Sequence, residues 1–196
     1  MQKPLVLAST SIYRRELLQR LQIPFTTAAP DIEETRLDQE EAHMMVARLA
    51  QQKAEAIAAY HPTALIIGSD QCAVLGEQIL GKPHSHENAT QQLQASSGRT
   101  VKFLTGLCLY DSQEQSFQLE VIAYAVEFRT LQAVEIENYL QREQPYNCVG
   151  SFKSEGLGIS LFKKMRGDDP TALIGLPLIA LCSMLRAKGY ELPTAI

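Results

Sequence analysis

The sequence lacks the clustered basic residues with which proteins bind a nucleic-acid duplex. Its 18 Lys and Arg residues are outnumbered by 22 Asp and Glu residues, so the formal net charge is -4. A duplex-binding face needs many closely spaced cations to displace the counterions of the phosphates. We therefore expect no nucleic-acid partner, whereas a local basic pocket for a small polyanion is compatible with this composition.

Long apolar runs are also missing. The first residues, MQKPLVLASTSIYRR, contain only a short apolar stretch, and ALIGLPLIALC at 172–182 is interrupted by Gly175 and Pro177. A membrane-spanning helix needs about 20 apolar residues, and a secretory signal needs an apolar stretch of about 7–15. We expect a soluble, cytoplasmic protein with no membrane partner.

The cysteines and histidines lack the spacing of a disulfide framework or a zinc site. No CxxC pair occurs among the four cysteines, which are Cys72, Cys108, Cys148 and Cys182. Thiols of cytosolic proteins stay reduced, and we expect these four to be free and buried. His84 and His86 are close in sequence, but no Cys or His at ligand spacing accompanies them, which disfavours a metal site there.

Hydrophobic residues make up 45% of the 196 positions, enough for one substantial core but not for two ordinary independent domains. The apolar periodicity locates the secondary-structure elements. Strands are expected at 5–8, 64–70, 78–80, 101–111 and 117–130, and helices at 13–21, 40–60, 86–95, 132–142 and 176–189. Strands that are separated by helices early in the chain and paired directly later indicate an α/β fold, with a mixed β-sheet flanked by helices, in one domain over 1–196.

Two arginines occupy the first turn of the helix at 13–21. The helix dipole disfavours cations there by about 0.3–1 kcal/mol each, so Arg14 and Arg15 are placed unfavourably unless an anion binds. A phosphate would gather both guanidinium groups, Ser9, Ser11 and free backbone N–H groups around one polyanion. The alternative is that both arginines point to solvent.

Lys53 interrupts the apolar stripe of the helix at 40–60, because Leu49 and Ile57 lie four residues away on either side. A lysine on such a stripe needs a partner. Its ammonium group either reaches water along the alkyl chain or contacts a phosphate.

Acidic residues mark two further positions. Asp70 is expected to end an apolar strand, where a carboxylate requires a metal, a base or hydrogen bonds, and strand ends host active sites. Glu33 and Glu34 lie on a polar loop and, together with Asp70, offer the oxygen ligands that divalent cations prefer. A solvated acidic loop is the alternative for the two glutamates.

The segment GEQILGKP at 76–83 has the GxxxxGK spacing of a phosphate-binding P-loop. Pro83 stands where a Ser or Thr would bind magnesium, and Ile79 and Leu80 are typical of a strand rather than of a loop that surrounds phosphate. We therefore interpret the segment as a hairpin that carries Lys82 as a cation.

Together these segments resemble the Maf family of nucleotide pyrophosphatases over essentially the whole chain. The matching segments are STSIYRRELL at 9–18, EE at 33–34, Lys53 in ARLAQQKA, GSDQ at 68–71, LGKP at 80–83, SGRT at 97–100, TG at 105–106 and GSFKSEGLG at 150–158. Their order and spacing carry the resemblance, rather than any one of them.

The resemblance implies a two-lobed α/β fold similar to inosine-triphosphate pyrophosphatases, with a nucleotide-binding cleft between the lobes, a homodimer, and dependence on Mg²⁺, Mn²⁺ or Co²⁺. It implies hydrolysis of a small-molecule nucleoside triphosphate between the α and β phosphates, with Asp70 accepting a proton from the attacking water. It also implies that Glu34 and Asp70 bind the metal, and that the phosphates are bound by Ser9, Ser11, Arg14, Arg15, Lys53 and Lys82.

Three positions differ from the family branch that acts on dTTP and UTP, which typically has Arg, Thr and Gln where this sequence has Tyr13, Gln71 and Glu155. These three residues resemble the 7-methyl-GTP branch. A carboxylate accepts hydrogen bonds from the N1 and N2 donors of guanine, whereas thymine offers one N–H between two carbonyls. Methylation at N7 makes the base cationic, which favours an aromatic and an acidic residue beside it.

We therefore expect 7-methyl-GTP to be the substrate. Two alternatives stay open at this point. One is pyrophosphatase action on dTTP and UTP, and the other is a nucleotide-binding regulator of septum formation without relevant turnover.

Overall fold

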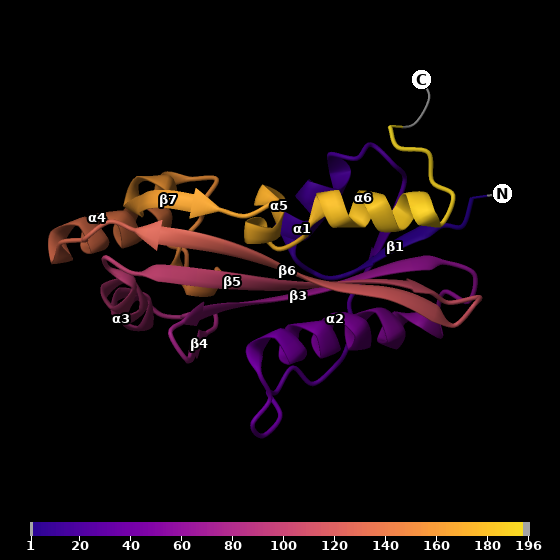
Figure 1. The fold of residues 1–196 in the computed structure, drawn as a ribbon, viewed down its shortest axis with the longest axis horizontal. Helices are drawn as coiled ribbons and strands as arrows, with labels where there is room; N and C mark the ends of the chain where they lie inside the picture. The colour runs from indigo at the N-terminus through magenta and orange to yellow at the C-terminus, as the bar shows by residue number, and fades with distance from the viewer. Residues whose placement is uncertain (1, 194–196) are drawn as a thin grey trace. The chain divides into compact units, whose positions relative to one another are not determined.

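The computed structural model describes residues 2–193, which form two compact units. Unit 1 comprises Met1–Asp70, Thr105–Ile122 and Asp169–Ile196, and unit 2 comprises Gln71–Leu104 and Ala123–Asp168. Three long strands, β3 (Leu65–Leu75), β5 (Thr100–Asp111) and β6 (Ser116–Phe128), contribute residues to both units. Figure 1 follows the elements along the chain.

The sheet is mixed, as predicted. Its strands are hydrogen-bonded in the order β2-β1-β3-β5-β6-β7, with β4 paired to β3. The parallel part joins β1 (Leu5–Ala8) to β2 (Thr26–Ala28) and to β3. Antiparallel pairs join β4 (Gln78–Leu80) to β3 and β7 (Phe162–Arg166) to β6. The short turn between β5 and β6 permits only an antiparallel pair there.

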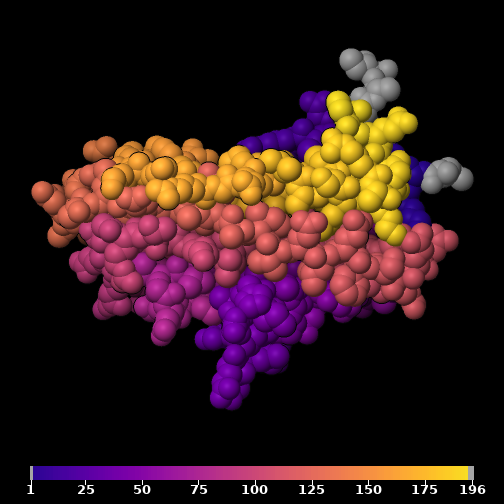
Figure 2. All heavy atoms as spheres, in the orientation of Figure 1, coloured from indigo at the N-terminus to yellow at the C-terminus, as the bar shows by residue number. Residues whose placement is uncertain are grey.

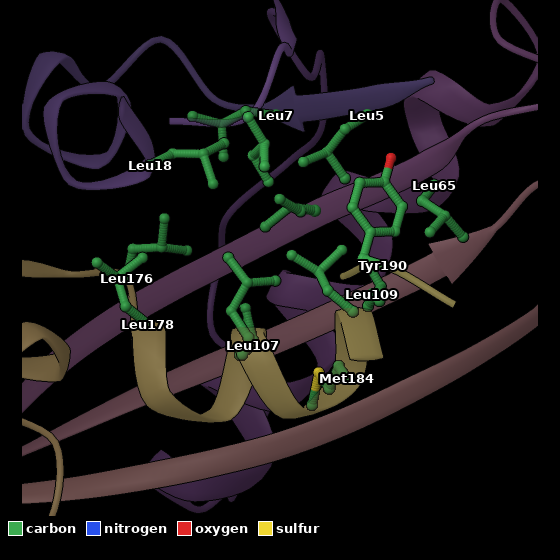
Figure 3. Close-up of a cluster of buried hydrophobic side chains, with 14 of the residues drawn as sticks. Leu5, Leu7, Leu18, Leu65, Leu107, Leu109, Leu176, Leu178, Met184 and Tyr190 are labelled. Carbon is green, nitrogen blue, oxygen red and sulfur yellow. The ribbon is translucent and has the colours of Figure 1, made fainter. Parts of the chain in front are cut away.

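In unit 1 the strands are covered by helices on both faces. Odd-numbered residues of β1, β3 and β5 pack with α1 (Ile12–Gln19) and α6 (Leu178–Ala187) into one core, which Figure 3 shows. Even-numbered residues pack with α2 (Ala42–Ala58) on the opposite face (Figure 1). Strands buried on both faces require this alternation. The first core includes Leu5, Leu7, Leu65, Ile67, Leu107, Leu109 and Leu181, and the second includes Val6, Ala8, Ala50, Ala54, Ile66 and Cys108.

Two glycines let α2 lie close against the sheet. A Cβ atom on Gly68 of β3 would lie 2.0 Å from the carbonyl oxygen of Ala50, and one on Gly106 of β5 would lie 2.1 Å from that of Val46. Any side chain at either position would push α2 away from the strands. Because α2 carries Lys53, these glycines also determine how close that lysine lies to β3.

Unit 2 has an aromatic core. The rings of Phe103, Phe128, Phe152 and Phe162 meet edge to face, with centroids 4.7 to 5.6 Å apart. Around this core lie α3 (His86–Ser96), α4 (Ala133–Glu143) and two short 3₁₀ helices, η1 (Val149–Ser151) and η2 (Leu157–Leu161).

The helix expected at 176–189 is only partly correct. The structure has α6 from Leu178 and a separate short helix, α5 (Pro170–Ile174), before it. Gly175 adopts a left-handed conformation with φ of 117° that ends α5, and Pro177 is the N-cap of α6. After α6, Gly189 adopts a left-handed conformation with φ of 83°, and its N–H donates to the carbonyl oxygen of Arg186.

Two further expectations need correction. Asp70 does not end a strand, since β3 continues to Leu75, although the parallel pairing of β3 with β1 stops at Ile67. No disulfide joins the four cysteines, but only Cys72 and Cys108 are buried, while the other two are half-buried. Among residues 2–193, no helix combines the length and the apolar character of a membrane span.

Asp111 forms a buried ion-pair cluster in unit 1. Its side chain is 0% exposed, and its carboxylate oxygens lie 2.7 Å from Nζ of Lys3 and 3.0 Å from Nζ of Lys188. Burial alone would raise the pKa of Asp111, but hydrogen bonds from both lysines and from the N–H of Glu114 outweigh it and lower the pKa to about 2. The carboxylate thereby ties the segment before β1 to the C-terminal end of α6.

The lowered pKa of Asp111 predicts a loss of stability in acid. The ionised carboxylate stabilises the fold fully above about pH 4, the ordinary pKa, and this contribution is lost as the pH falls toward about 2. We expect Asp111→Asn to lower the free energy of unfolding at neutral pH, with the difference from wild type shrinking toward pH 2, in urea titrations at several pH values. Glu114→Gln, which alters an exposed partner of the same lysines, should have a smaller effect. A difference independent of pH would contradict this role.

Candidate functional site

A buried ion pair joins α2 to β3 in unit 1. Lys53 and Asp70 are 5% and 7% exposed, and Nζ of the lysine lies 2.6 Å from Oδ1 of the aspartate. The same Nζ lies 2.9 Å from Oε1 of Glu34. The expectation that Lys53 needs a partner is confirmed, and its ammonium group stands between two carboxylates rather than in open solvent.

The loop that carries Glu34 is fastened to α2. Arg48 on α2 donates to both carboxylate oxygens of Glu40 at 2.6 and 2.7 Å and to the carbonyl oxygen of Thr35 at 3.2 Å. The hydrogen bonds between Arg48 and Glu40 lower the pKa of Glu40 and raise the pKa of Arg48. Figure 2 shows this indigo segment, which precedes α2 in the chain, projecting from the surface. Glu33 and Glu34 are both exposed, as the solvated alternative expected, but Glu34 also pairs with Lys53, whereas Glu33 accepts a hydrogen bond from Thr35.

Arg14 and Arg15 lie in the first turn of α1, as predicted. The surroundings of the two side chains differ. Arg14 is half-buried, and its Nε donates to the carbonyl oxygen of Gly175 at 2.8 Å. Burial lowers the pKa of Arg14, and the nearby charges of Asp70 and Glu34 oppose this shift. Arg15 is exposed, so the solvent-pointing alternative holds for that residue alone.

Two hydroxyl groups line the N-terminus of α1. Ser11 is the N-cap, and its Oγ accepts the N–H of Arg14 at 3.4 Å, while Oγ of Ser9 accepts the N–H of Ser11 at 3.1 Å. Each hydroxyl can still donate its own proton. These residues follow β1 directly, and Asp70 lies beyond the last parallel pair of β3 with β1. The serines, the α1 terminus and Asp70 therefore share the carboxyl edge of the parallel strands, where α/β folds bind ligands.

Sequence reasoning missed the segment at 169–175. The carbonyl oxygen of Gly175 accepts hydrogen bonds from Nε of Arg14 and, at 2.9 Å, from Oγ of Ser69, the residue before the site aspartate. The carboxylate of Asp169 holds this segment by accepting the N–H groups of Thr171 at 2.9 Å and of Ile179 at 2.7 Å. The Asp-Pro pair at 169–170 signals a helix start and could have revealed α5, but no residue type reveals a carbonyl oxygen that orients an arginine.

The remaining predicted residues are distributed between the units. Tyr13 on α1 is half-buried in unit 1, and Gln71 on β3 is half-buried in unit 2. Lys82 is exposed just after β4, whose pairing with β3 confirms the hairpin and excludes the P-loop. Glu155 is exposed on a turn before η2, and its Oε2 accepts a hydrogen bond from Ser154 at 3.0 Å.

Residues 4–188 match the family model described as Maf-like protein. The chain belongs to the Maf family. It is 56% identical over 190 residues to the 7-methyl-GTP pyrophosphatase of Pseudomonas fluorescens strain Pf0-1. The aligned region covers 97% of this chain and 99% of that protein. The 7-methyl-GTP pyrophosphatase of Nitrosococcus oceani is 58% identical over 186 residues, with coverage of 95% and 94%. That of Colwellia psychrerythraea is 52% identical over 189 residues, with coverage of 96% and 94%.

A solved structure, that of the Staphylococcus aureus Ham1 protein, is similar with a TM-score of 0.47 and 16% identity, covering 65% of this chain and 73% of that one. In this Maf chain, three of the segments that carried the resemblance meet in unit 1. STSIYRRELL forms the N-terminus of α1, ARLAQQKA supplies Lys53, and GSDQ supplies Gly68, Ser69 and Asp70. Within residues 2–193 no three His, Cys, Asp or Glu side chains are arranged to hold a metal ion by themselves.

Proposed function

We propose that this Maf protein hydrolyses 7-methyl-GTP to 7-methyl-GMP and pyrophosphate. One water molecule is consumed, and the phosphoanhydride bond between the α and β phosphates breaks. The observation that carries this proposal is the identity of 52% to 58%, over nearly the full length, to proteins named 7-methyl-GTP pyrophosphatase. The Lys53–Asp70 pair and the charged side chains around it offer what this reaction needs, a carboxylate to accept a proton and cations to bind phosphates.

Asp70 is our candidate for the group that accepts the proton of the attacking water. A carboxylate has about four lone-pair positions, so it can accept from a water molecule as well as from Lys53. The ion pair at 2.6 Å and the adjacent Ser69–Gly175 hydrogen bond hold this carboxylate in a defined orientation. A fixed acceptor is what general-base catalysis requires.

The N-terminus of α1 is our candidate for triphosphate binding. Ser9, Ser11, Arg14 and Arg15 lie there, and a bound polyanion turns the unfavourable cations of this turn into favourable ones. Lys53 adds a further positive charge from α2. We assign Lys82 of unit 2 to the phosphates on the basis of the family resemblance.

We also propose that Asp70 and Glu34 hold a divalent cation, Mg²⁺, Mn²⁺ or Co²⁺. The fit is supported by one feature: oxygens of both carboxylates lie within 3 Å of the same Nζ, at 2.6 and 2.9 Å, so two hard oxygen donors already face one cationic position. When bound, such an ion neutralises charge on the phosphates. A homodimer and a cytoplasmic location are further proposals, which rest on the resemblance alone.

Base selectivity is assigned to Tyr13, Gln71 and Glu155. The carboxylate of Glu155 is exposed and can accept hydrogen bonds from N1 and N2 of guanine, and its charge favours a base made cationic by N7 methylation. The aromatic ring of Tyr13 suits the same cationic base.

A substrate panel tests the proposed function. Purified protein with Mg²⁺ or Mn²⁺ is incubated with 7-methyl-GTP, GTP, dTTP and UTP, and kcat/KM is measured for each by chromatography of the products. We expect 7-methyl-GTP to exceed dTTP and UTP by at least about 10-fold, and Glu155→Gln to reduce that ratio. Preference for dTTP and UTP would favour the first alternative, and nucleotide binding without turnover would favour the regulator.

A further inference from the structure

Glu143 occupies an electrostatically unfavourable position in unit 2. It is the last residue of α4, where the helix dipole disfavours a carboxylate. Its side chain is nevertheless only 18% exposed and points to the segment after Phe152. Oε2 accepts the N–H of Leu157 at 2.8 Å, and Oε1 lies 3.3 Å from Nζ of Lys153. The contacts that compensate for this position therefore all come from one segment, 153–157.

That segment is the turn that carries Glu155. The N–H of Gly156 donates to the carbonyl oxygen of Lys153 at 3.4 Å, which closes a turn with Glu155 near its tip. The backbone N–H of Lys153 donates to the hydroxyl of Tyr139 at 3.1 Å, and its Nζ donates to the carbonyl oxygen of Glu143 at 3.3 Å. Both ends of the turn are thus held by the C-terminal part of α4.

Two glycines let the turn lie directly on these groups. A Cβ atom on Gly156 would lie 2.8 Å from Oε2 of Glu143, and one on Gly158 would lie 2.3 Å from the carbonyl oxygen of Lys153. A side chain at Gly156 would therefore force the Glu143 carboxylate to shift from its present contacts. The exposed side chain of Glu155 therefore sits on a backbone whose position is determined by Glu143.

We propose that Glu143 is a positioning residue for base selectivity. Through Leu157 and Lys153 it fixes the turn that presents the Glu155 carboxylate to the guanine edge. This inference rests on the proposed function, in which Glu155 recognises the base. Hydrogen-bond recognition depends on alignment, and a displacement of about 1 Å can cost on the order of 10²-fold in rate.

Substitutions at Glu143 separate its two contacts. Glu143→Gln keeps an acceptor for the N–H of Leu157 but removes the charge opposite Lys153, whereas Glu143→Ala removes both. We expect kcat/KM for 7-methyl-GTP to fall about 10-fold in the alanine variant and less in the glutamine variant, mainly through KM, with UTP hydrolysis almost unchanged. Glu137→Gln, which changes an exposed glutamate of the same helix, is the matched control and should behave as wild type.

A double-mutant cycle with Glu155→Gln gives the decisive readout. If Glu143 acts through Glu155, Glu143→Ala reduces the ratio of 7-methyl-GTP to UTP activity in the wild-type background but changes it less than about 2-fold in the Glu155→Gln background. Equal effects in both backgrounds, or an equal loss on both nucleotides, would overturn the inference and leave the proposed function intact. A wild-type protein without preference for 7-methyl-GTP, or with unchanged selectivity in Glu155→Gln, would overturn the proposed role of Glu155 and this inference together.

Discussion

Asp70→Asn is expected to lower kcat for 7-methyl-GTP by about 10²–10⁴-fold while the protein stays folded. The asparagine oxygen can still accept the hydrogen bond of Lys53, and the ammonium group keeps Glu34 as a charged partner at 2.9 Å. An amide oxygen cannot take a proton from water as a carboxylate does. Steady-state kinetics with product chromatography, together with thermal melting followed by circular dichroism, measure the two effects separately.

The matched control for this variant is Asp38→Asn, which removes one carboxylate from the exposed loop that also carries Glu34. It should retain wild-type kcat, because its carboxylate is not part of the ion pair. If Asp70→Asn keeps more than about half of the wild-type kcat, Asp70 is not the general base.

Lys53→Met is expected to reduce both stability and activity. Without the ammonium group, the buried carboxylate of Asp70 and the carboxylate of Glu34 face each other with no cation between them. Breaking a buried pair by removing one partner costs about 3–5 kcal/mol, and urea unfolding should give a loss at the lower end of this range because Glu34 is largely exposed. The loss of one of the cations that we propose to bind the phosphates should also lower kcat/KM by about 10²–10³-fold.

Two further variants make this prediction specific. Lys164→Met removes an exposed lysine of β7 and should leave stability and activity near wild type. Lys53→Met combined with Asp70→Asn should recover part of the lost stability, because no buried carboxylate is left unpaired, but none of the activity. A Lys53→Met protein that is as stable and as active as wild type would show that the ion pair has neither role.

The central strands could be predicted from the sequence because each begins with an uninterrupted run of apolar residues. LVLA at 5–8 and ALII at 64–67 are buried on both faces, and an uninterrupted apolar run of this length is typical of a parallel strand between two helical layers. The same reasoning located α2 and placed Lys53 on its apolar stripe. The need of that lysine for a partner was therefore predictable from helical periodicity alone.

The identity of the partners was not predictable in the same way. Lys53 meets Asp70 because Gly68 and Gly106 bring α2 close to the sheet, and it meets Glu34 rather than Glu33 because the Arg48–Glu40 pair fixes the loop. These are distances between elements far apart in the sequence, which no local pattern encodes.

Other misses have local physical reasons. The strand β7 carries Lys163, Lys164 and Arg166, a charged edge-strand composition that hides its β-period. The extension of β3 beyond Asp70 follows from its antiparallel pairing with β4, whereas a polar residue after an apolar run normally suggests a strand end. The role of Glu143 depends on backbone N–H groups and glycines of the 153–158 segment, which residue types alone do not reveal.

The proposed function depends on cleavage of the bond between the α and β phosphates of 7-methyl-GTP. The most direct test is to incubate the purified protein with 7-methyl-GTP and Mg²⁺ and to quantify every phosphorus-containing product by ³¹P NMR. We expect 7-methyl-GMP and pyrophosphate in equal amounts from the first turnovers. Orthophosphate released together with 7-methyl-GDP would contradict this expectation.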